Sequence, residues 1–333
     1  MDNSLNPRPD WFEYWPIRST LPETLEEMAD EDYLGFFSPR FFEKTGLTAQ
    51  DLREFAALHG NESDILLFSP QPDISAFFVN VFAGEDFFNP GFFPASQSVL
   101  ATIGVATDLS NLVTDSRNTV FSNYFLARPC FWHQWFALTE KIFLLAESEM
   151  SSATVSGISE DLGQAVMAST TPRVSTGLTA KISSGNAPDP PQCQRESETG
   201  AVEAPPKQVV KDPSAASFLP SNATLTVPTN YGNGAQRKVF LIERIATLMI
   251  AASIPRTWKA KAYEPFRLAW SAHFAHSQEE AVLCDALKIA FQATGFSSFA
   301  GKYHGLRTTA LNRLYHSVSG NAGQGADRLE RVD

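Results

Sequence analysis

The stretch YLGFFSPRFFEKTGLTAQDLREFAALHGNESDILLFSP, residues 33–70, decides the fold class. Its two ends, YLGFF at 33–37 and DILLFSP at 64–70, are short apolar runs bounded by turn residues, which is typical of buried strands. Between them, Thr48 and Asp51 have the three-residue spacing of a capping box, and an apolar stripe follows. The stretch therefore predicts a strand, a helix and a strand, and this order favours a parallel pair with a right-handed crossover.

Helical patterns dominate the rest of the chain outside a polar middle segment. A strand predicted at 118–127 leads into a helix at 128–147, whose first turn holds Pro129 and whose Trp132 and Trp135 are interpreted as packing residues. Further helices are expected at 74–82, 94–103, 236–252, 277–295 and 297–315. Together these elements predict an α/β fold, with a mixed or parallel sheet flanked by helices and a C-terminal helical part.

Composition divides the chain into four parts. Residues 1–150 form the expected α/β core. Residues 151–235 are rich in Ser, Thr, Ala, Pro and Gly, so they bury too little apolar surface to offset their ordering entropy and are predicted to be a flexible low-complexity insertion. Helices within 236–316 are expected to pack on the core, and residues 317–333 are predicted to be a disordered tail.

The bulk composition limits the class of protein. The chain has 333 residues, 43% of them apolar, and a net charge of −11, so it can bury a core of its own. No apolar run reaches the roughly 20 residues that a membrane-spanning helix needs, and no leader pattern opens the chain, so a cytoplasmic location is expected. The positive charge is dispersed without a known binding motif, which disfavours nucleic acid as a partner. The three cysteines fit neither a disulfide framework nor a zinc site.

Polar side chains gather beside the predicted strands at 64–70 and 118–127. In open α/β sheets ligands bind outside the carboxyl ends of the strands, so the group after the first strand is well placed for a site if the sheet is parallel, and the group at the second strand is a further candidate. They are Ser69 and Asp73 after the first strand, and Asp115, Asn118 and Asn123 before or within the second. Ser, Asp and Asn are also common turn and cap residues, and this alternative stays open for each of them.

Several motifs of well-known enzymes are missing from the sequence. The chain has no G-x-G-x-x-G, P-loop, G-x-S-x-G or H-E-x-x-H pattern. The triplet DED at 30–32 has the acidic spacing with which many sugar-nucleotide enzymes hold a divalent metal, and Mg²⁺ or Mn²⁺ would suit its oxygen ligands. The same triplet follows EEMA and also fits the solvated end of a helix, so the metal and the cofactor stay open.

Seven blocks carry a family resemblance. They are DWFEYWPIR at 10–18, YLGFFSPRFFEKTGLTAQDL at 33–52, DILLFSPQPD at 64–73, NVFAGEDFFNPGFF at 80–93, DSRNTVFSNYFLARPCFWHQW at 115–135, KVFLIER at 238–244 and CDALKIAF at 284–291. Together they resemble a family of bacterial glycosyltransferase-like proteins that is often found in O-antigen and capsular polysaccharide gene clusters. The blocks cover most of residues 10–147 and 236–292.

The resemblance implies a GT-A-like α/β fold and an enzyme that transfers a sugar from a nucleotide-sugar donor to a glycan acceptor. The segment 122–135 would supply a wall on the acceptor side, with Asn123 and Tyr124 near the sugar. The chain departs from ordinary GT-A enzymes, because it lacks a convincing Asp-x-Asp site and the N-terminal strand and loop that cradle the nucleotide. The alternative is a non-enzymatic sugar-binding or scaffold protein, and no oligomeric state is indicated.

Roles for individual residues follow from the transferase hypothesis. Asp73 or Asp115 would deprotonate an acceptor hydroxyl or orient the sugar, because this step needs a carboxylate within hydrogen-bond reach. Ser69 and Asn118 would bind substrate beside them. The cations that would neutralise the leaving diphosphate, or else pair with the acidic N-terminal half, are Lys238, Arg244 and Lys288. Convergence of Asp73, Asp115 and Asn123 on one pocket would favour the enzyme, and dispersal would favour the scaffold.

Overall fold

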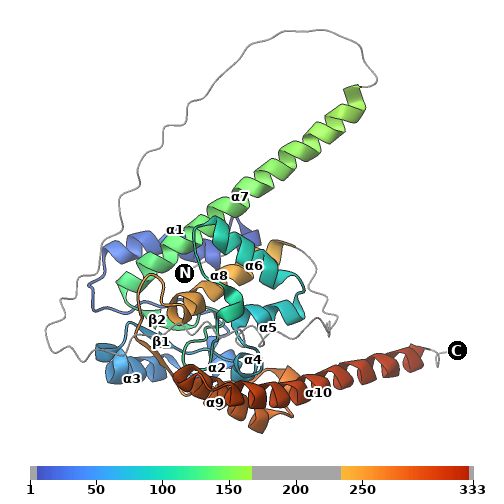
Figure 1. The fold of residues 1–333 in the computed structure, drawn as a ribbon. Coiled ribbons are helices and arrows are strands. Elements are labelled where there is room, and N and C mark those ends of the chain that lie inside the picture. The colour runs from blue at the N-terminus through green and yellow to red at the C-terminus, as the bar shows by residue number, and fades with distance from the viewer. Residues whose placement is uncertain (1–5, 167–233, 330–333) are drawn as a thin grey trace.

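Helices packed around a small sheet make up the structure, a computed structural model that describes residues 6–166 and 234–329 (Figure 1). The sheet has three strands in the order β2-β1-β3. The central strand β1, Ile65–Leu67, pairs antiparallel with β2, Phe125–Ala127, and parallel with β3, Ala260–Ala262. The expected α/β class with a mixed sheet is thus confirmed, although helix predominates.

The segment 33–37 does not form the strand that the sequence predicted. It meets the sheet through one antiparallel bridge, from Leu34 to Ala127, at the outer edge of β2. Both edges of β1 are occupied by β2 and β3, so the predicted parallel pair is wrong. Gly35 lets the segment lie against β2, since a Cβ at this position would stand 2.6 Å from the carbonyl oxygen of Phe125.

Local capping signals did predict two helix starts. Helix α3, Ala49–His59, begins with the expected capping box, in which the Thr48 hydroxyl accepts from the Asp51 amide and the Asp51 carboxylate accepts from the Thr48 amide. Helix α7, Pro129–Val166, begins at the predicted proline. Proline suits this position because the first amides of a helix have no partner within the helix.

In two regions the helices and strands are shorter than the sequence predicted. The single helix expected at 74–82 is two helices, α4 (Pro72–Phe77) and α5 (Val81–Phe88). The Asn80 side chain divides them, because its oxygen accepts from two backbone amides in the first turn of α5, at 3.0 and 2.9 Å. The strand expected at 118–127 shrinks to β2, since Ser122 and Asn123, shortly before it, have left-handed backbone.

The other elements are helices and short 3-10 turns. The helices are α1 (Tyr14–Glu26), α2 (Phe41–Thr45), α6 (Phe92–Thr102), α8 (Gly234–Ala251), α9 (Gln278–Thr294) and α10 (Ser297–Leu329). The 3-10 turns are η1 (Pro9–Trp11), η2 (Gly60–Glu62), η3 (Leu109–Asn111), η5 (Pro265–Arg267) and η6 (Ala272–Phe274). No helix in the described ranges is both long enough and apolar enough to cross a membrane.

The main core lies where α7 and α8 pack together beside the sheet (Figure 1). Trp132 and Trp135 are fully buried there, which confirms their interpretation as packing residues. The Trp132 ring stacks on Phe125 of β2 with 4.7 Å between the ring centroids. Burying a large apolar side chain of this kind stabilises the fold by roughly 2–3 kcal/mol, so the aromatic start of α7 fixes this helix on the sheet.

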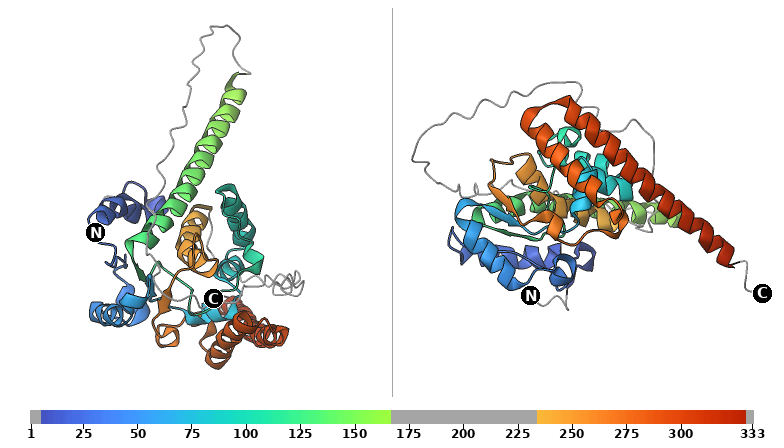
Figure 2. Two further views of the ribbon diagram at one scale, coloured as in Figure 1. Left: turned by 60° about the vertical axis from the view of Figure 1, so that its left-hand side comes forward. Right: turned by 90° about the horizontal axis from the view of Figure 1, so that it is seen from below.

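The C-terminal helices contact the core through α9, which packs on α4 and runs beside α10 (Figure 2). Both α7 and α10 continue past the compact body (Figures 1 and 2). Helix α7 reaches residue 166, within the predicted insertion 151–235, and α10 reaches Leu329, within the predicted disordered tail 317–333. The remainder of the predicted insertion and tail lies outside the described residues.

Candidate functional site

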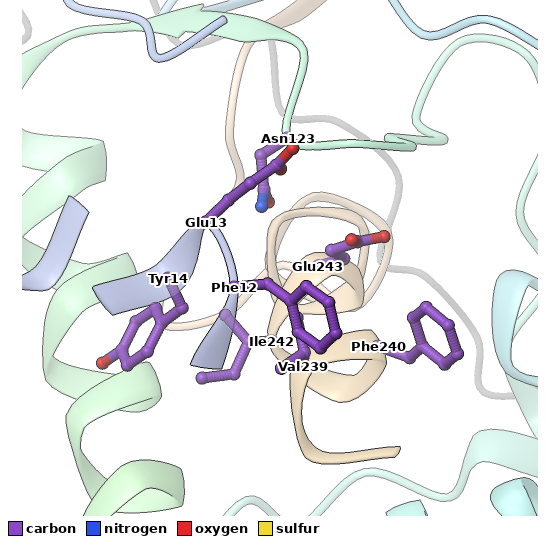
Figure 3. A pocket seen from close by; sticks show the side chains of 8 residues that line it. All are labelled: Phe12, Glu13, Tyr14, Asn123, Val239, Phe240, Ile242 and Glu243. Carbon is purple, nitrogen blue, oxygen red and sulfur yellow. The ribbon is translucent and has the colours of Figure 1, made fainter. Parts of the chain in front are cut away.

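Two adjoining cavities lie along α8. The smaller one, shown in Figure 3, lies between α8, the start of α1 and the residues before β2, and the larger one lies between α8, α4 and α5. The smaller has a volume of about 160 Å³ and the larger of about 410 Å³. Phe240 and Glu243 line both, so the two cavities form one cleft, which we call the Glu243 cleft. The residues around the smaller cavity are Phe12, Glu13, Tyr14, Asn123, Val239, Phe240, Ile242 and Glu243.

Helix α8 supplies the centre of the cleft. Its stretch VFLIER, residues 239–244, is apolar except for Glu243 and Arg244. Phe240 and Glu243 are three residues apart, so they share one side of the helix. The Glu243 side chain is 23% exposed, whereas Ile242 beside it is buried. The packing of α8 on α7 therefore places the Glu243 carboxyl group at the edge of the apolar core.

Left-handed backbone surrounds the cleft. Five non-glycine residues have a positive φ in the described part of the chain, and four of them line the cleft. The four are Phe12 (44°), Gln71 (60°), Ser122 (57°) and Asn123 (54°). Backbone of this kind costs on the order of 1–3 kcal/mol for each residue and is concentrated at ligand sites and active sites. This clustering marks the cleft as the candidate functional site.

Hydrogen bonds to other segments anchor the residues before β2. The Phe121 amide donates to the Ser69 hydroxyl at 2.8 Å, and the Tyr124 hydroxyl forms a hydrogen bond with Ser38. Asn123 is 4% exposed, and its Oδ1 accepts no hydrogen bond from any described residue. A buried oxygen without a donor costs about 1–3 kcal/mol, and this oxygen is closed to the cavity as well as to solvent.

Two carboxyl groups of the cleft hold their protons more tightly than usual. Burial raises the pKa of Glu243 to about 7; the Arg244 charge opposes this rise, and the Glu13 and Glu85 charges add to it. Burial also raises the pKa of Glu13, against the charge of Lys44. No described residue donates a hydrogen bond to the Glu243 carboxylate. A carboxyl group with a pKa near neutrality can accept or donate a proton at pH 7.

Arg244 stands beside Glu243, with 3.7 Å between the Arg244 Nη1 and a Glu243 carboxylate oxygen. Its donors are nonetheless directed to other groups. Nη2 donates to the Glu85 carboxylate, Nη1 to the Phe240 carbonyl at 2.8 Å, and Nε to the Val81 carbonyl at 3.4 Å. The Arg244 side chain is 6% exposed and lines the larger cavity. Its ion pair with Glu85 connects α8 to α5.

The two predicted catalytic carboxylates line neither cavity. Asp73 is fully buried and accepts hydrogen bonds from the amide and the hydroxyl of Ser271, a residue that lines the larger cavity. Asp115 is also fully buried and accepts from a neighbouring arginine and, at 2.8 Å, from Gln292. Asp73 and Asp115 therefore do not converge with Asn123 on one pocket, the arrangement that would favour an enzyme, because both aspartates bind protein donors.

Most of the predicted substrate-binding residues also have partners in the protein. Lys288 is 1% exposed, and its ammonium group donates to three backbone carbonyls. Lys238 forms an ion pair with Asp10 and lies 4.1 Å from the centre of the Trp11 ring. The Asn118 side chain accepts from a backbone amide at 2.9 Å and so closes a turn. The expected contact of these residues with a diphosphate stays a prediction.

The acidic triplet at 30–32 lies away from the cleft residues. The Asp32 carboxylate accepts from the amide of Ala29 at 2.9 Å, which closes a turn after α1. Across residues 6–166 and 234–329, no group of three or more His, Cys, Asp or Glu side chains could hold a metal ion. The triplet thus has no further ligand of these types beside it in that part of the chain.

Sequence reasoning found Asn123 and Arg244 among the residues of the cleft and missed the others. Glu243 follows an apolar run directly before Arg244, and the sequence analysis passed it over. A carboxylate within such an apolar helix is itself a signal, since glutamate is almost never buried without a partner. Phe12 and Gln71 carry no comparable signal, because neither residue type favours a positive φ.

Comparisons with known proteins add no further constraint. No family model, curated protein or solved structure matches the chain. The function is therefore argued from the geometry and charge of the Glu243 cleft.

Proposed function

We propose that the protein is a cytoplasmic glycosyltransferase-like protein of bacterial surface polysaccharide assembly, and that its Glu243 cleft binds the acceptor sugar. The observation that carries the proposal is the position of the Glu243 carboxyl group, which lines both cavities among aromatic side chains and accepts no hydrogen bond from a described residue. Burial also raises its pKa, to about 7. Transfer to a sugar hydroxyl needs a base that is partly ionised at neutral pH. The GT-A-like fold and the nucleotide-sugar donor belong to the same proposal.

The walls of the cleft suit a sugar ring. Flat rings come from Phe12 and Phe240 in the smaller cavity and from Phe88, Phe121 and His273 in the larger. Such rings can cover the apolar face of a sugar, while the few polar groups between them can bind its hydroxyls. The volume of the larger cavity, about 410 Å³, also falls within the roughly 300–1,000 Å³ of small-molecule sites.

In the proposed reaction Glu243 acts as the base. The acceptor hydroxyl loses its proton to the Glu243 carboxylate while its oxygen forms a bond to the anomeric carbon of the donor sugar. The bond from that carbon to the nucleoside diphosphate breaks, and the diphosphate leaves with the electron pair. Asp73 then has a positioning role, because it holds Ser271 at the wall of the larger cavity.

A sugar-binding protein without transferase activity is the second candidate, and the cations favour it. Lys238, Arg244 and Lys288 were predicted to neutralise the leaving diphosphate. Each of them donates instead to a carboxylate or to backbone carbonyls of the protein. A diphosphate would have to compete with these partners, whereas a neutral sugar would leave them in place.

The test is the release of nucleoside diphosphate from UDP-, GDP- and dTDP-sugars, measured with the full chain and a panel of monosaccharide acceptors. We expect release that depends on the acceptor, and we expect Glu243→Gln to lower its rate about 100-fold or more, because general base catalysis contributes about 10²–10⁴. Glu23→Gln, on the exposed side of α1, is the matched control and should keep the wild-type rate.

Two results would change the assignment. Sugar binding without release from any donor would favour the sugar-binding protein. Full activity of the Glu243→Gln variant would remove Glu243 from the reaction.

A further inference from the structure

Phe12 has a backbone conformation that phenylalanine rarely adopts. Its φ is 44° and its ψ is −123°. These angles are close to those of the first central position in a type II′ turn, which glycine normally occupies because it has no Cβ. Gln71, at the larger cavity, has φ 60° and ψ 53°, the ordinary left-handed helical region. A bulky residue with a positive φ is a genuine outlier, so the need for a phenylalanine at this position has to be explained.

The neighbours of Phe12 explain the turn but not the side chain. Trp11 is fully buried and Tyr14 is 1% exposed, and their rings pair with 5.6 Å between the centroids. The chain turns between these two anchors, and the Phe12 amide donates to the Pro9 carbonyl at 3.2 Å. Glycine would make the same turn without strain, so the turn gives no reason for an aromatic ring.

Packing on the core does not explain this ring either. Phe12 is 49% exposed, so much of its apolar surface stays in contact with water and adds little to stability. Phe42, in helix α2, is more exposed still, but it has no positive φ and lines neither cavity. Single exposed side chains such as Phe42 are normal on protein surfaces. Phe12 combines exposure with a strained backbone and lines the smaller cavity, and contact with a ligand accounts for all three features.

The wall around Phe12 is mainly apolar. Five of the eight side chains that line the smaller cavity are aromatic or aliphatic, and none of the eight is cationic. Figure 3 shows the Glu243 carboxylate above the rings of Phe12 and Phe240, and the Tyr14 hydroxyl pointing away from these rings. The Asn123 oxygen is closed to the cavity. The part of the cavity beside Phe12 therefore suits an uncharged, apolar group.

The size of the smaller cavity restricts what this group can be. Its volume of about 160 Å³ is below the roughly 300–1,000 Å³ of sites that hold a whole small molecule. It is also many times the roughly 10–15 Å³ that a single water needs, so it has room for several heavy atoms. The larger cavity shares the walls formed by Phe240 and Glu243 and can hold a whole ligand. A ligand that fills both would place its body in the larger cavity and an apolar substituent in the smaller.

We propose that Phe12 binds a short acyl group, so that the acceptor of the proposed function is an acylated sugar such as an N-acetylated amino sugar. The sugar ring would lie in the larger cavity, and the acyl group would extend past Phe240 with its methyl end against the Phe12 ring. Phe12 is then a specificity residue and takes no part in the proton transfer. The choice of a sugar rests on the proposed function, whereas the acyl group rests on Phe12 and the smaller cavity alone.

A ligand-binding role of Phe12 predicts effects of opposite sign on stability and on binding. Phe12→Gly relieves the backbone strain and removes the ring, so the Tm should equal or exceed that of the wild type while the affinity for the acyl group falls. Phe42→Gly is the matched control. It removes an exposed phenylalanine from a helix and away from both cavities, so the Tm should fall and the affinity should stay unchanged.

The experiment is a saturation-transfer NMR titration of the full chain with three probes, together with thermal unfolding of each variant. The probes are N-acetyl-D-glucosamine, D-glucose and N-cyclohexylacetamide, which carries the same acetamido group on a ring without hydroxyls. We expect the wild type to bind N-acetylglucosamine about tenfold more tightly than glucose, since each buried carbon of the acyl group contributes roughly fourfold. Phe12→Gly should reduce this preference to about twofold or less, whereas Phe42→Gly should keep it.

The outcomes separate the acyl site from the proposed function. Equal binding of the two sugars would overturn the acyl site and leave the sugar site standing, and so would a preference that Phe12→Gly leaves unchanged. Binding of N-cyclohexylacetamide that is lost in Phe12→Gly, together with no binding of either sugar, would support the acyl site and overturn the proposed function. A Tm of Phe12→Gly as low as that of Phe42→Gly would make Phe12 a packing residue and overturn its assignment. No binding of any probe would overturn both proposals.

Discussion

Lys288 and Glu243 are both charged side chains taken largely out of water, but their surroundings differ. Lys288 is 1% exposed and donates to the carbonyls of Ser75, Phe78 and Thr114. Glu243 has a 23% exposed side chain and no hydrogen-bond donor among the described residues. A buried charge with a full set of partners stabilises the fold, whereas one without partners keeps its binding capacity for a ligand.

The largest effect is expected from the fully partnered site. Lys288→Met removes the ammonium group and leaves three buried carbonyls without a donor, so the free energy of unfolding should fall by about 4 kcal/mol or more. Chemical denaturation measures this loss, and Lys302→Met on the exposed side of α10 is the matched control with little expected change. A loss no greater than that of the control would show that Lys288 is not a structural cation.

Glu243 should behave in the opposite way. Its pKa is raised from 4.5 to about 7, so the folded state binds more protons than the unfolded state between these values. The free energy of unfolding should therefore fall as the pH rises from about 4.5 to about 7, by at most about 3 kcal/mol. Glu243→Gln should lack this fall and be at least as stable as the wild type at about pH 8.

Denaturation curves of the two proteins at several pH values test this difference. An identical pH dependence in the wild type and the variant would contradict the raised pKa. A variant that loses several kcal/mol at about pH 8 would show that Glu243, like Lys288, is a structural charge.

Asp73 should fall between these two cases. It is fully buried and bound by Ser271, so Asp73→Ala should lower the free energy of unfolding by about 2 kcal/mol, the amount typical of hydrogen bonds to a charged group. Asp30→Ala, on an exposed turn, is the control. Because Asp73 acts through Ser271, transfer activity should fall less than in Glu243→Gln. A stable Asp73→Ala variant without activity would instead restore Asp73 as the base.

The smallest effect concerns the backbone at the cleft. Ser122→Gly should raise the free energy of unfolding by up to about 1 kcal/mol, because glycine adopts φ 57° without strain. Ser19→Gly, within helix α1, should lower it by a similar amount because glycine weakens a helix. Thermal unfolding of both variants tests whether strain is present at Ser122, and a loss in both would contradict it.

The sequence predicted the features that local chemistry determines. The Thr48 and Asp51 capping box, the helix start at Pro129 and the packing of Trp132 and Trp135 follow from residue type and spacing. Strands β1 and β2 lie within the strands predicted at 64–70 and 118–127, but the pairing of the sheet did not follow, because three-residue strands are too short for an alternating pattern. β3 in particular reads AKA and gives no strand signal, although it pairs with β1.

The cleft was harder to predict than the sheet, and for a different reason. Asp73 and Asp115 are good ligand candidates by residue type, but in the structure they bind Ser271 and Gln292. What distinguishes Glu243 is that it accepts no hydrogen bond from a described residue and has only the 3.7 Å ion pair with Arg244, and this depends on three-dimensional packing. Sequence spacing shows which residues could pair, but it does not show which ones are left without a partner.

The most direct test of the Glu243 cleft is the titration of the Glu243 carboxyl group, followed by ¹³C NMR of the side-chain carbon in the full chain and assigned with Glu243→Gln. We expect a midpoint of about 7, because burial of this carboxyl group raises its pKa. A midpoint near 4.5 would contradict the assignment of Glu243 as the acid-base group of a ligand site.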